Sequence, residues 1–287
     1  MDMALLQEKV QEIRDEINET VINGEFTKSN GDVVSKDNGL QAREALIRSE
    51  KLIQKIHEVA KVSLANEITH SGLENFEVHP PIGSPSPEKD VWGLLKKKKQ
   101  DVVVLFQQPE SETIEEGPLI GKVDLLGKEA TKNSIVIGVR SQLSSIDKNF
   151  DTLMERAFAE TMNLRLRHPY LVMGEVYLLA VKEYDEQAMK ENRIAFKNRF
   201  TNVEKFISIF DGISNRMDHE NLYESYKYEK SALILVDFSQ NPVKIYTSLD
   251  ELKADGIVSS DFNEDYDILA PQNFASGIVE KYLDRHH

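Results

Sequence analysis

The sequence predicts an α/β protein in which a mixed central sheet is flanked by helices, with a helical region at the N-terminus. Two observations predict this fold class. Short apolar runs rich in β-branched residues are typical of buried strands, and amphipathic segments lie between some of them. The runs are 101–106, 135–139, 172–181 and 231–238, and the amphipathic segments are 149–164 and 203–210. Strands that alternate with helices favour a sheet covered on both faces.

The first 70 residues are expected to be mainly helical. Leu6, Val10, Ile13, Ile17 and Val21 are spaced by three and four, which indicates one apolar helix stripe over 3–22. Asn23-Gly24 is typical of a helix end, and the turn-rich segment 25–39 indicates a loop or small hairpin. A second long helix is expected over 40–66. This region, 1–70, could form a dimer interface or pack behind the sheet, and 71–287 would be the α/β domain.

The connecting segments are expected to be less regular. Four prolines between 71 and 92 indicate an ordered loop or an extended arm. The polar segment 107–133 is interpreted as a hairpin excursion, and 183–199 as helix or loop. A further strand is expected at 242–247, and the acidic C-terminal segment 261–287 is expected to be looser.

Composition narrows the class of protein. The chain has 287 residues and no Cys, which excludes a disulfide framework, a thiolate metal site and a Cys nucleophile, and suits a reducing cytoplasm. No apolar run reaches the roughly 18 to 20 residues that span a bilayer, and the acidic N-terminus does not resemble a signal peptide. The net charge of −14 argues against nucleic acid as a partner. However, charge distribution matters more than the sum, and Lys96, Lys97, Lys98 and Lys99 form a basic block.

Because the common nucleotide-binding and hydrolase motifs are absent from the sequence, one candidate site is left. The chain contains no Walker phosphate loop, GxGxxG, HExxH or GxSxG pattern. Asp101 begins one predicted strand, and Arg140, Ser141 and Gln142 end the next. If the two strands are neighbours, a carboxylate with a second oxygen ligand could hold Mg²⁺ and activate water against a phosphodiester. The alternative interpretation is that Asp101 caps a turn while Arg140 and Gln142 are solvated.

Several short segments together resemble a known family. Arg140-Ser141-Gln142, then Lys148-Asn149-Phe150 and Glu155-Arg156-Ala157, are similar to the active-site strand and helix of XhoI-like type II restriction endonucleases. Those enzymes belong to the PD-(D/E)xK nuclease superfamily. Gln100-Asp101-Val102 resembles the start of the family's upstream strand, and 174–179 resembles the strand that follows its helix. The resemblance covers about residues 100–182.

The resemblance implies a restriction-endonuclease-like core, Mg²⁺-dependent cleavage of double-stranded DNA, and a homodimer in the cytoplasm, with no membrane association. It implies that Asp101 binds the metal, with Glu155 as the second acid and metal ligand. Arg140 and Gln142 would act on the scissile phosphate or on water. The predicted DNA-binding residues are Lys96, Lys97, Lys98, Lys99, Ser141 and Asn149. Base recognition is expected from the loops at 71–99 and 107–133.

The sequence departs from the family at two positions. The family's Glu falls on Gly138 and its Lys falls on Arg140, and Arg does not give up a proton as Lys can. The missing acid could come from Glu155 or Glu160, Gln142 could serve as a polar ligand, or the site could be inactive. Glu155 could instead be part of a solvated helix face, and the lysine run a solvated charge run.

Two further interpretations stay open. Glu175 lies inside a predicted strand and needs a partner, either Arg140 or Arg165, in a structural ion pair. The alternative function is a non-catalytic protein with a nuclease fold that binds DNA or a protein, which Gly138 favours; a scaffold without any nucleic-acid role is a third possibility.

Overall fold

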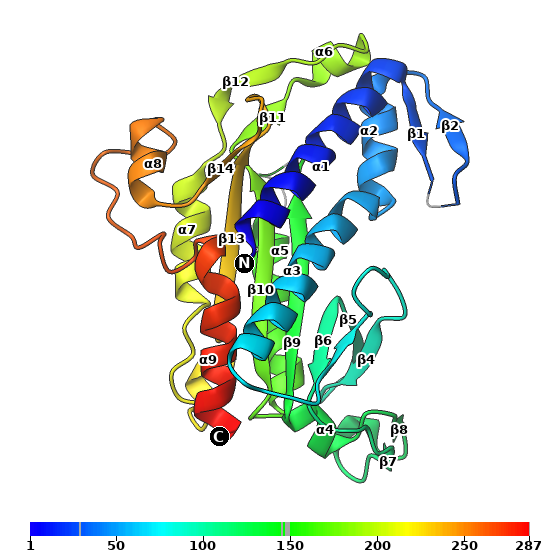
Figure 1. Ribbon diagram of the computed structural model, residues 1–287, viewed down its shortest axis with the longest axis vertical. Helices are drawn as coiled ribbons and strands as arrows, with labels where there is room; N and C mark the ends of the chain where they lie inside the picture. The colour runs from blue at the N-terminus through cyan, green and yellow to red at the C-terminus, as the bar shows by residue number, and fades with distance from the viewer. Residues whose placement is uncertain (29, 145, 147–149, 287) are drawn as a thin grey trace.

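The computed structural model describes residues 1–28, 30–144, 146 and 150–286. Within them the central element is a sheet in the order β14-β13-β10-β9-β6-β3 (Figure 1). Its strands are β3 (Glu77–His79), β6 (Val102–Leu105), β9 (Ser134–Gln142), β10 (Val172–Ala180), β13 (Lys230–Asp237) and β14 (Lys244–Tyr246). β9, β10 and β13 are parallel, and β3, β6 and β14 are antiparallel to their neighbours. The predicted α/β class with a mixed sheet is confirmed.

The two long central strands fix the register that matters for the site. β9 and β10 pair from Val172 with Ile135 to Leu179 with Gln142. Every residue of β10 is buried, as expected for a strand covered on both faces, which needs apolar side chains in both directions. Alternate residues therefore point to opposite helix layers.

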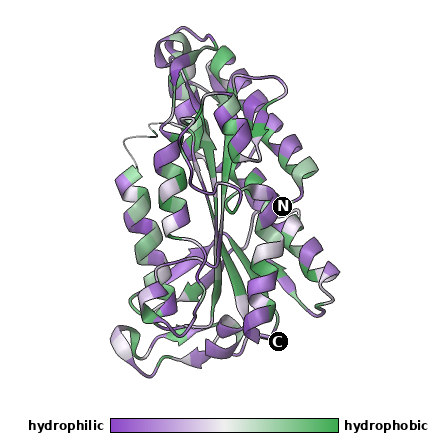
Figure 2. Ribbon diagram, turned by 90° about the vertical axis from the view of Figure 1, so that its left-hand side faces the viewer, coloured by the Kyte–Doolittle hydropathy of each residue, from purple (hydrophilic) through white to green (hydrophobic). Residues whose placement is uncertain are grey.

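Helices cover both faces of the sheet, and Figure 2 shows the hydrophobic strands between them. The helices on the face nearer the viewer in Figure 1 are α1 (Met3–Asn23), α3 (Lys51–His70) and α9 (Phe274–His286). The helices on the other face are α5 (Phe150–Arg165) and α7 (Val203–Gly212). Gly174 of β10 lies against Ile278 and Phe274 of α9, whereas Tyr177 lies against Phe206 and Phe210 of α7, with ring centroids 6.3 and 5.2 Å away.

The N-terminal region differs from the prediction in one respect. α1 ends as expected, with Gly24 in the left-handed conformation at φ 65°. The predicted single helix over 40–66 is wrong: it is two helices, α2 (Gly39–Arg48) and α3, separated at Glu50, whose φ is 63°. A left-handed Glu is rare, so no residue type in this segment indicates that the helix breaks here. The helices of 1–70 share one hydrophobic core with the sheet, and their role in a dimer stays a prediction.

Smaller elements connect the layers. The expected excursion over 107–133 contains the hairpin β7–β8 (Glu112–Thr113, Val123–Asp124), and the lysine run belongs to the hairpin β4–β5 (Lys89–Trp92, Lys97–Gln100). The segment 183–199 is a hairpin, β11–β12 (Lys182–Tyr184, Phe196–Phe200), that encloses α6 (Glu186–Lys190). The remaining elements are β1 (Glu25–Thr27), β2 (Val33–Ser35), α4 (Lys128–Lys132) and α8 (Leu249–Ala254). In the described part of the chain, no helix has the length and apolar character needed to cross a membrane.

The C-terminal segment is more ordered than the sequence predicts. The expectation of a loose 261–287 is wrong for α9, which packs on β10 and β13. Its buried residues are Phe274, Ala275, Ile278, Val279 and Tyr282, an i, i+4, i+8 stripe that the acidic composition around it obscures. The amino group of Met1 donates to the carbonyls of Pro271 and Gln272 at 2.8 and 2.9 Å, so the start of the chain contacts the start of α9.

We expect α9 to contribute strongly to stability. Ile278→Ala should lower the free energy of unfolding in urea by about 2 to 5 kcal/mol, because Ile278 is fully buried against the sheet. Glu280→Ala, on the exposed side of the same helix, should change it by less than about 0.5 kcal/mol. Equal effects of the two substitutions would show that α9 does not pack as described.

Candidate functional site

A cluster of charged side chains lies at β9 and the elements around it. We call it the Arg140 cluster, and its members are Lys98, Asp101, Arg140, Glu160 and Glu175. They come from the β4–β5 hairpin, the bend before β6, β9, α5 and β10, respectively. The sheet and α5 therefore bring together Asp101 and Arg140, which the sequence singled out, with the buried carboxylates Glu160 and Glu175.

Arg140 makes the central contacts of this cluster. Its Nη1 donates to Glu175 Oε1 at 2.7 Å, and its Nη2 donates to Glu160 Oε2. The two carboxylate side chains are 1% and 5% exposed, so the charges interact in a medium of low polarity. Burial alone would lower the pKa of Arg140, but the nearby Glu175, Tyr228 and Glu160 keep that pKa above its usual range. Arg140 is therefore half-buried and paired with carboxylates, and of the two partners considered for Glu175 it is the one observed.

Asp101 is held where β6 stops pairing with β9. The last ladder pair is Val102 with Ile137, and beyond it Asp101 Oδ2 accepts a hydrogen bond from the Val139 backbone N–H at 2.7 Å. The Asp101 carboxylate thus accepts the next hydrogen bond of the β6–β9 pairing, where a backbone carbonyl would otherwise do so. Burial raises the pKa of Asp101 to about 6, against the opposing effects of the Val139 N–H and Arg140.

Glu175 occupies the space above Gly138. The two residues are paired in the register of β9 and β10, and a Cβ on Gly138 would overlap Glu175 Oε2. That oxygen is buried and has no hydrogen-bond partner in the part of the chain that the structure describes. Burial raises the pKa of Glu175 to about 7, although Arg140 opposes the shift, and Glu160 and Asp101 add to it. Glycine at 138 is therefore what allows a carboxylate from the neighbouring strand to lie there.

The lysine run is divided by the alternation of a strand. In β5 the side chain of Lys98 forms an ion pair with Glu160. Lys97 is exposed on the other side, with its Nζ 2.7 Å from Asp90 Oδ2, and Lys99 is exposed too. Lys96 precedes the strand and is exposed. Lys96, Lys97 and Lys99 are therefore exposed, and only Lys98 joins the cluster. The pairing of β4 with β5 is what places Lys98 in a strand and turns it inward.

The other predicted residues lie around the cluster or away from it. Gln142 is on the same strand face as Arg140; its Nε2 donates to the Ser144 carbonyl at 2.5 Å. Ser141 is half-buried on the opposite face of β9. Glu155 is exposed on α5, whereas Glu160, which α5 turns inward, is in the cluster. The structure therefore does not bring Glu155 to Asp101. Asn149 lies outside the described residues.

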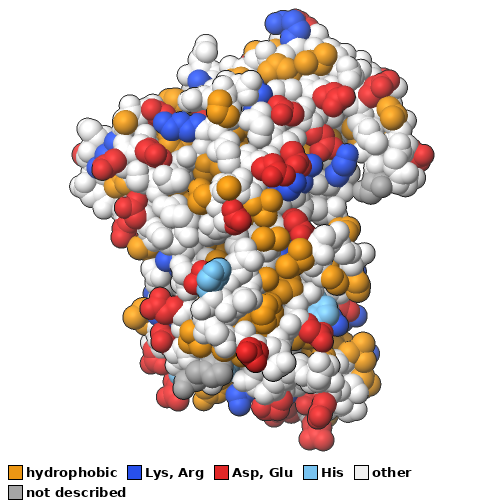
Figure 3. All heavy atoms as spheres, viewed as in Figure 1, with side chains coloured by type: hydrophobic (Ala, Val, Ile, Leu, Met, Phe, Trp, Pro, Cys, Tyr) orange, Lys and Arg blue, Asp and Glu red, His pale blue; other side chains and the backbone are white. Residues whose placement is uncertain are grey.

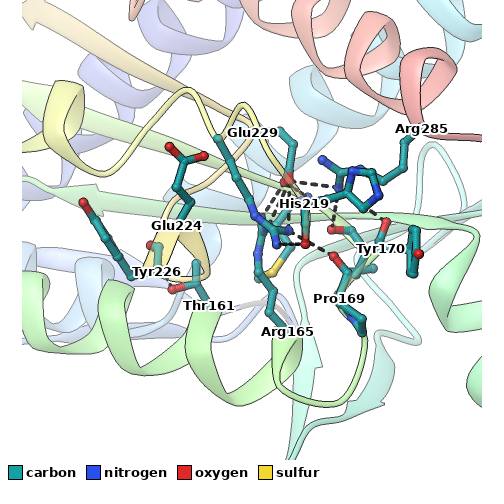
Figure 4. Close-up of polar contacts among 12 residues, drawn as sticks. Thr161, Arg165, Pro169, Tyr170, His219, Glu224, Tyr226, Glu229 and Arg285 are labelled. Atoms are coloured by element: carbon teal, nitrogen blue, oxygen red, sulfur yellow. Dashed lines mark hydrogen bonds and ion pairs between the residues drawn. The ribbon is translucent and has the colours of Figure 1, made fainter. Parts of the chain in front are cut away.

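A second buried ionic cluster fixes the start of β10. Glu229 accepts from Arg165 Nη1 and Nη2 at 2.9 and 2.6 Å and from Arg285 Nη1 at 2.9 Å (Figure 4). It also accepts from the Met173 backbone N–H at 2.6 Å. Although burial opposes ionisation, Arg165 and Arg285 hold the pKa of Glu229 below its usual range. Arg165 is therefore engaged here and not with Glu175, and the contacts join α5, β10 and α9.

The surface over α1, α3 and α9 does not resemble a phosphate-binding face. Figure 3 shows acidic side chains interspersed with basic ones there, and apolar side chains along the middle. The Arg140 cluster lies under α5, on the opposite layer. A groove of about 1250 Å³ is lined from both loops predicted to read bases, with Gly93 and Leu94 from one loop and 112–117 from the other.

The cluster could hold a hard divalent cation through few protein ligands. Among the described residues, no group of three or more His, Asp or Glu side chains has an arrangement suited to a metal. Mg²⁺ is commonly bound by one or two carboxylates, with water and substrate phosphate completing its shell. Glu175 Oε2 is a buried oxygen that has no hydrogen-bond partner within the ranges that the structure describes, and Asp101 influences the ionisation of Glu175. These two carboxylates are the side chains that could hold such an ion.

Comparison with known proteins adds no assignment. No family model, no curated protein and no solved structure gives a significant match to the chain. The interpretation of the site therefore depends on its residues and geometry.

The buried state of Asp101 predicts a pH effect on stability. Its pKa is raised from 3.8 to about 6, so the folded protein ionises this group less readily than the unfolded chain does. The contribution of this carboxyl to the free energy of unfolding is therefore present at low pH and is lost as pH rises from about 4 through 6. Asp101→Asn keeps an acceptor for Val139 and does not ionise. In buffer with a chelator, its stability relative to the wild type should therefore rise between pH 4 and 7.

The rise should be on the order of 2 to 3 kcal/mol, measured by urea unfolding at each pH. Asp90→Asn is the matched control, because Asp90 pairs with Lys97 on the surface and should give a nearly flat difference. A flat difference for Asp101→Asn would contradict the buried environment described for this carboxyl.

Proposed function

We propose that this protein is a metal-dependent endonuclease that hydrolyses phosphodiester bonds of double-stranded DNA, with a restriction-endonuclease-like core. The observation that carries the proposal is the Glu175 carboxylate above Gly138, which interacts electrostatically with Asp101. In the family that 100–182 resembles, an acid stands on the strand position that Gly138 occupies. Here the neighbouring strand supplies a carboxylate to the same place, so the departure at Gly138 does not remove the acid.

The roles of the residues follow from their contacts. Asp101 and Glu175 Oε2 would hold Mg²⁺, which when bound lowers the pKa of water and neutralises charge on a phosphate. Arg140 orients Glu175 through Oε1, whereas Oε2 lies over Gly138. Asp101 is kept in place by the Val139 N–H. Gln142, two residues further along the same strand face, would contact the scissile phosphate or position the attacking water.

DNA would approach the layer that contains α5. The groove between the β4–β5 hairpin and the β7–β8 excursion lies where base-reading loops are expected, and Lys97 and Lys99 are exposed elsewhere on the same hairpin. Exposed lysines of this kind suit phosphate contacts, which position a protein without reading sequence. Cutting both strands symmetrically requires two sites, so the active form would be a homodimer.

One observation favours the alternative function of a non-catalytic DNA- or protein-binding protein with this fold. Both arms of Arg140 are engaged by carboxylates, so the position that carries the family's Lys has no cation free for substrate. The experiment below separates the two functions.

We expect cleavage to depend on Glu175 and Asp101. Each of Glu175→Ala and Asp101→Ala should lower Mg²⁺-dependent cutting of a genomic DNA of mixed sequence by about 10³-fold or more, because a lost metal ligand removes several kcal/mol of transition-state stabilisation. Glu155→Ala is the matched control, since Glu155 is exposed on α5, and should cut like the wild type. A wild-type protein that binds DNA but never cuts it with Mg²⁺ would support the non-catalytic alternative.

The carboxylate should also function when it is supplied from β9 instead of β10. Gly138→Glu combined with Glu175→Ala places a carboxylate on β9 where the Glu175 side chain was, with Arg140 two residues away on the same face. This double variant should cut at least about tenfold faster than Glu175→Ala alone. Gly138→Gln with Glu175→Ala should not recover, because an amide is a poor replacement for a charged metal ligand. If the Gln version recovers equally, the acid at this place is not required.

A further inference from the structure

Lys98 is the more exposed of the two cations in the Arg140 cluster. Its side chain is 34% exposed, and among the described residues it forms an ion pair with Glu160. Arg140 is 21% exposed and forms ion pairs with two buried carboxylates. A substrate phosphate that enters the cluster would meet the Lys98 ammonium without separating a buried Arg–Glu pair, and such separation is costly.

The position of Lys98 is set by the docking of its hairpin on α5. The Asn163 side chain donates from Nδ2 to the Lys96 carbonyl at 3.0 Å and accepts from the Leu95 N–H at 2.9 Å. The Asn163 carbonyl accepts from the Leu94 N–H at 2.7 Å. Gly93 lies so close to Asn163 that a Cβ there would overlap it. A hairpin held by these contacts presents Lys98 to Glu160 in a defined place.

A lysine remote from the cluster provides a matched control. Lys244 lies in β14 at the edge of the sheet, with β13 and β10 between it and β9. Its side chain is 31% exposed and forms an ion pair with Asp255, so Lys98 and Lys244 carry the same charge and each has a carboxylate partner. They differ in whether the partner belongs to the Arg140 cluster.

We propose that Lys98 is a catalytic residue whose ammonium contacts a non-bridging oxygen of the scissile phosphate. This inference rests on the proposed nuclease function. The phosphate gains negative charge density as the attacking oxygen approaches, and a donor aimed at that charge in a water-poor site stabilises the transition state more than the ground state. Arg140 orients the acid, and Lys98 takes the phosphate-contacting role that a second cation must fill.

The experiment compares Lys98→Met, Lys98→Arg and Lys244→Met with the wild type. Lys98→Met should lower kcat on mixed-sequence genomic DNA by about 10² to 10³-fold. Lys98→Arg, which keeps the charge and donors, should stay within about tenfold of the wild type, and Lys244→Met should be unchanged. The fold should survive Lys98→Met, because Glu160 keeps its ion pair with Arg140; equal thermal unfolding temperatures would verify this.

A second readout does not depend on cleavage. Without metal, the slope of log Kd against log salt for a 200-base-pair mixed-sequence duplex should decrease in magnitude by about 0.9 in Lys98→Met, because one phosphate contact is lost. Unchanged kcat in Lys98→Met overturns the inference, whatever its slope, and so does an equal loss of kcat in Lys244→Met. In those cases wild-type cutting leaves the proposed function intact. A wild type that neither binds nor cuts DNA overturns both.

Discussion

The ion pair between Arg140 and Glu175 is the interaction on which the site depends. A fully buried carboxylate on the central strand of a sheet is costly to ionise, and Arg140 reduces that cost by donating to Oε1 at 2.7 Å. Buried pairs of this kind contribute little net stability, but removing one partner leaves an uncompensated charge and costs about 3 to 5 kcal/mol. The pair is thus a constraint on geometry: it fixes where Glu175 Oε2 lies and requires glycine beneath it at 138.

The frame around this pair is rigid for identifiable reasons. Eight consecutive register pairs join β9 to β10, and the Glu229 cluster holds the start of β10 to the end of α5 and to α9. α5 in turn holds the β4–β5 hairpin through Asn163. Each charged side chain of the Arg140 cluster is therefore presented by an element that is itself anchored, which is what a preorganised polar site needs.

The sequence predicted the parts of the fold that depend on local pattern. Apolar β-branched runs correctly indicated the long strands, and the stripe from Leu6 to Val21 indicated α1. The break at Glu50 was missed because a glutamate in the left-handed conformation is set by tertiary packing and not by its own preference. α9 was missed because its apolar stripe stands among acidic residues and is short.

The site was predictable only in part, because its composition depends on strand register and alternation. Asp101 and Arg140 were found from their places at strand ends. The relation of Glu175 to Gly138 follows from the pairing of two parallel strands, which no single segment encodes. Glu160 rather than Glu155 faces inward because five residues turn a helix by about 140°, and Lys98 faces inward because β5 alternates.

The central claim is that Asp101 and Glu175 form one metal-binding pair. The most direct test is a titration with Mn²⁺, followed through the electron paramagnetic resonance of the free ion, in the presence of a mixed-sequence duplex. The wild type should bind Mn²⁺ at the site, and Asp101→Asn and Glu175→Gln should each weaken that binding by at least about tenfold, while Glu155→Gln leaves it unchanged. Mn²⁺ affinity that is insensitive to both Asp101→Asn and Glu175→Gln would contradict the account.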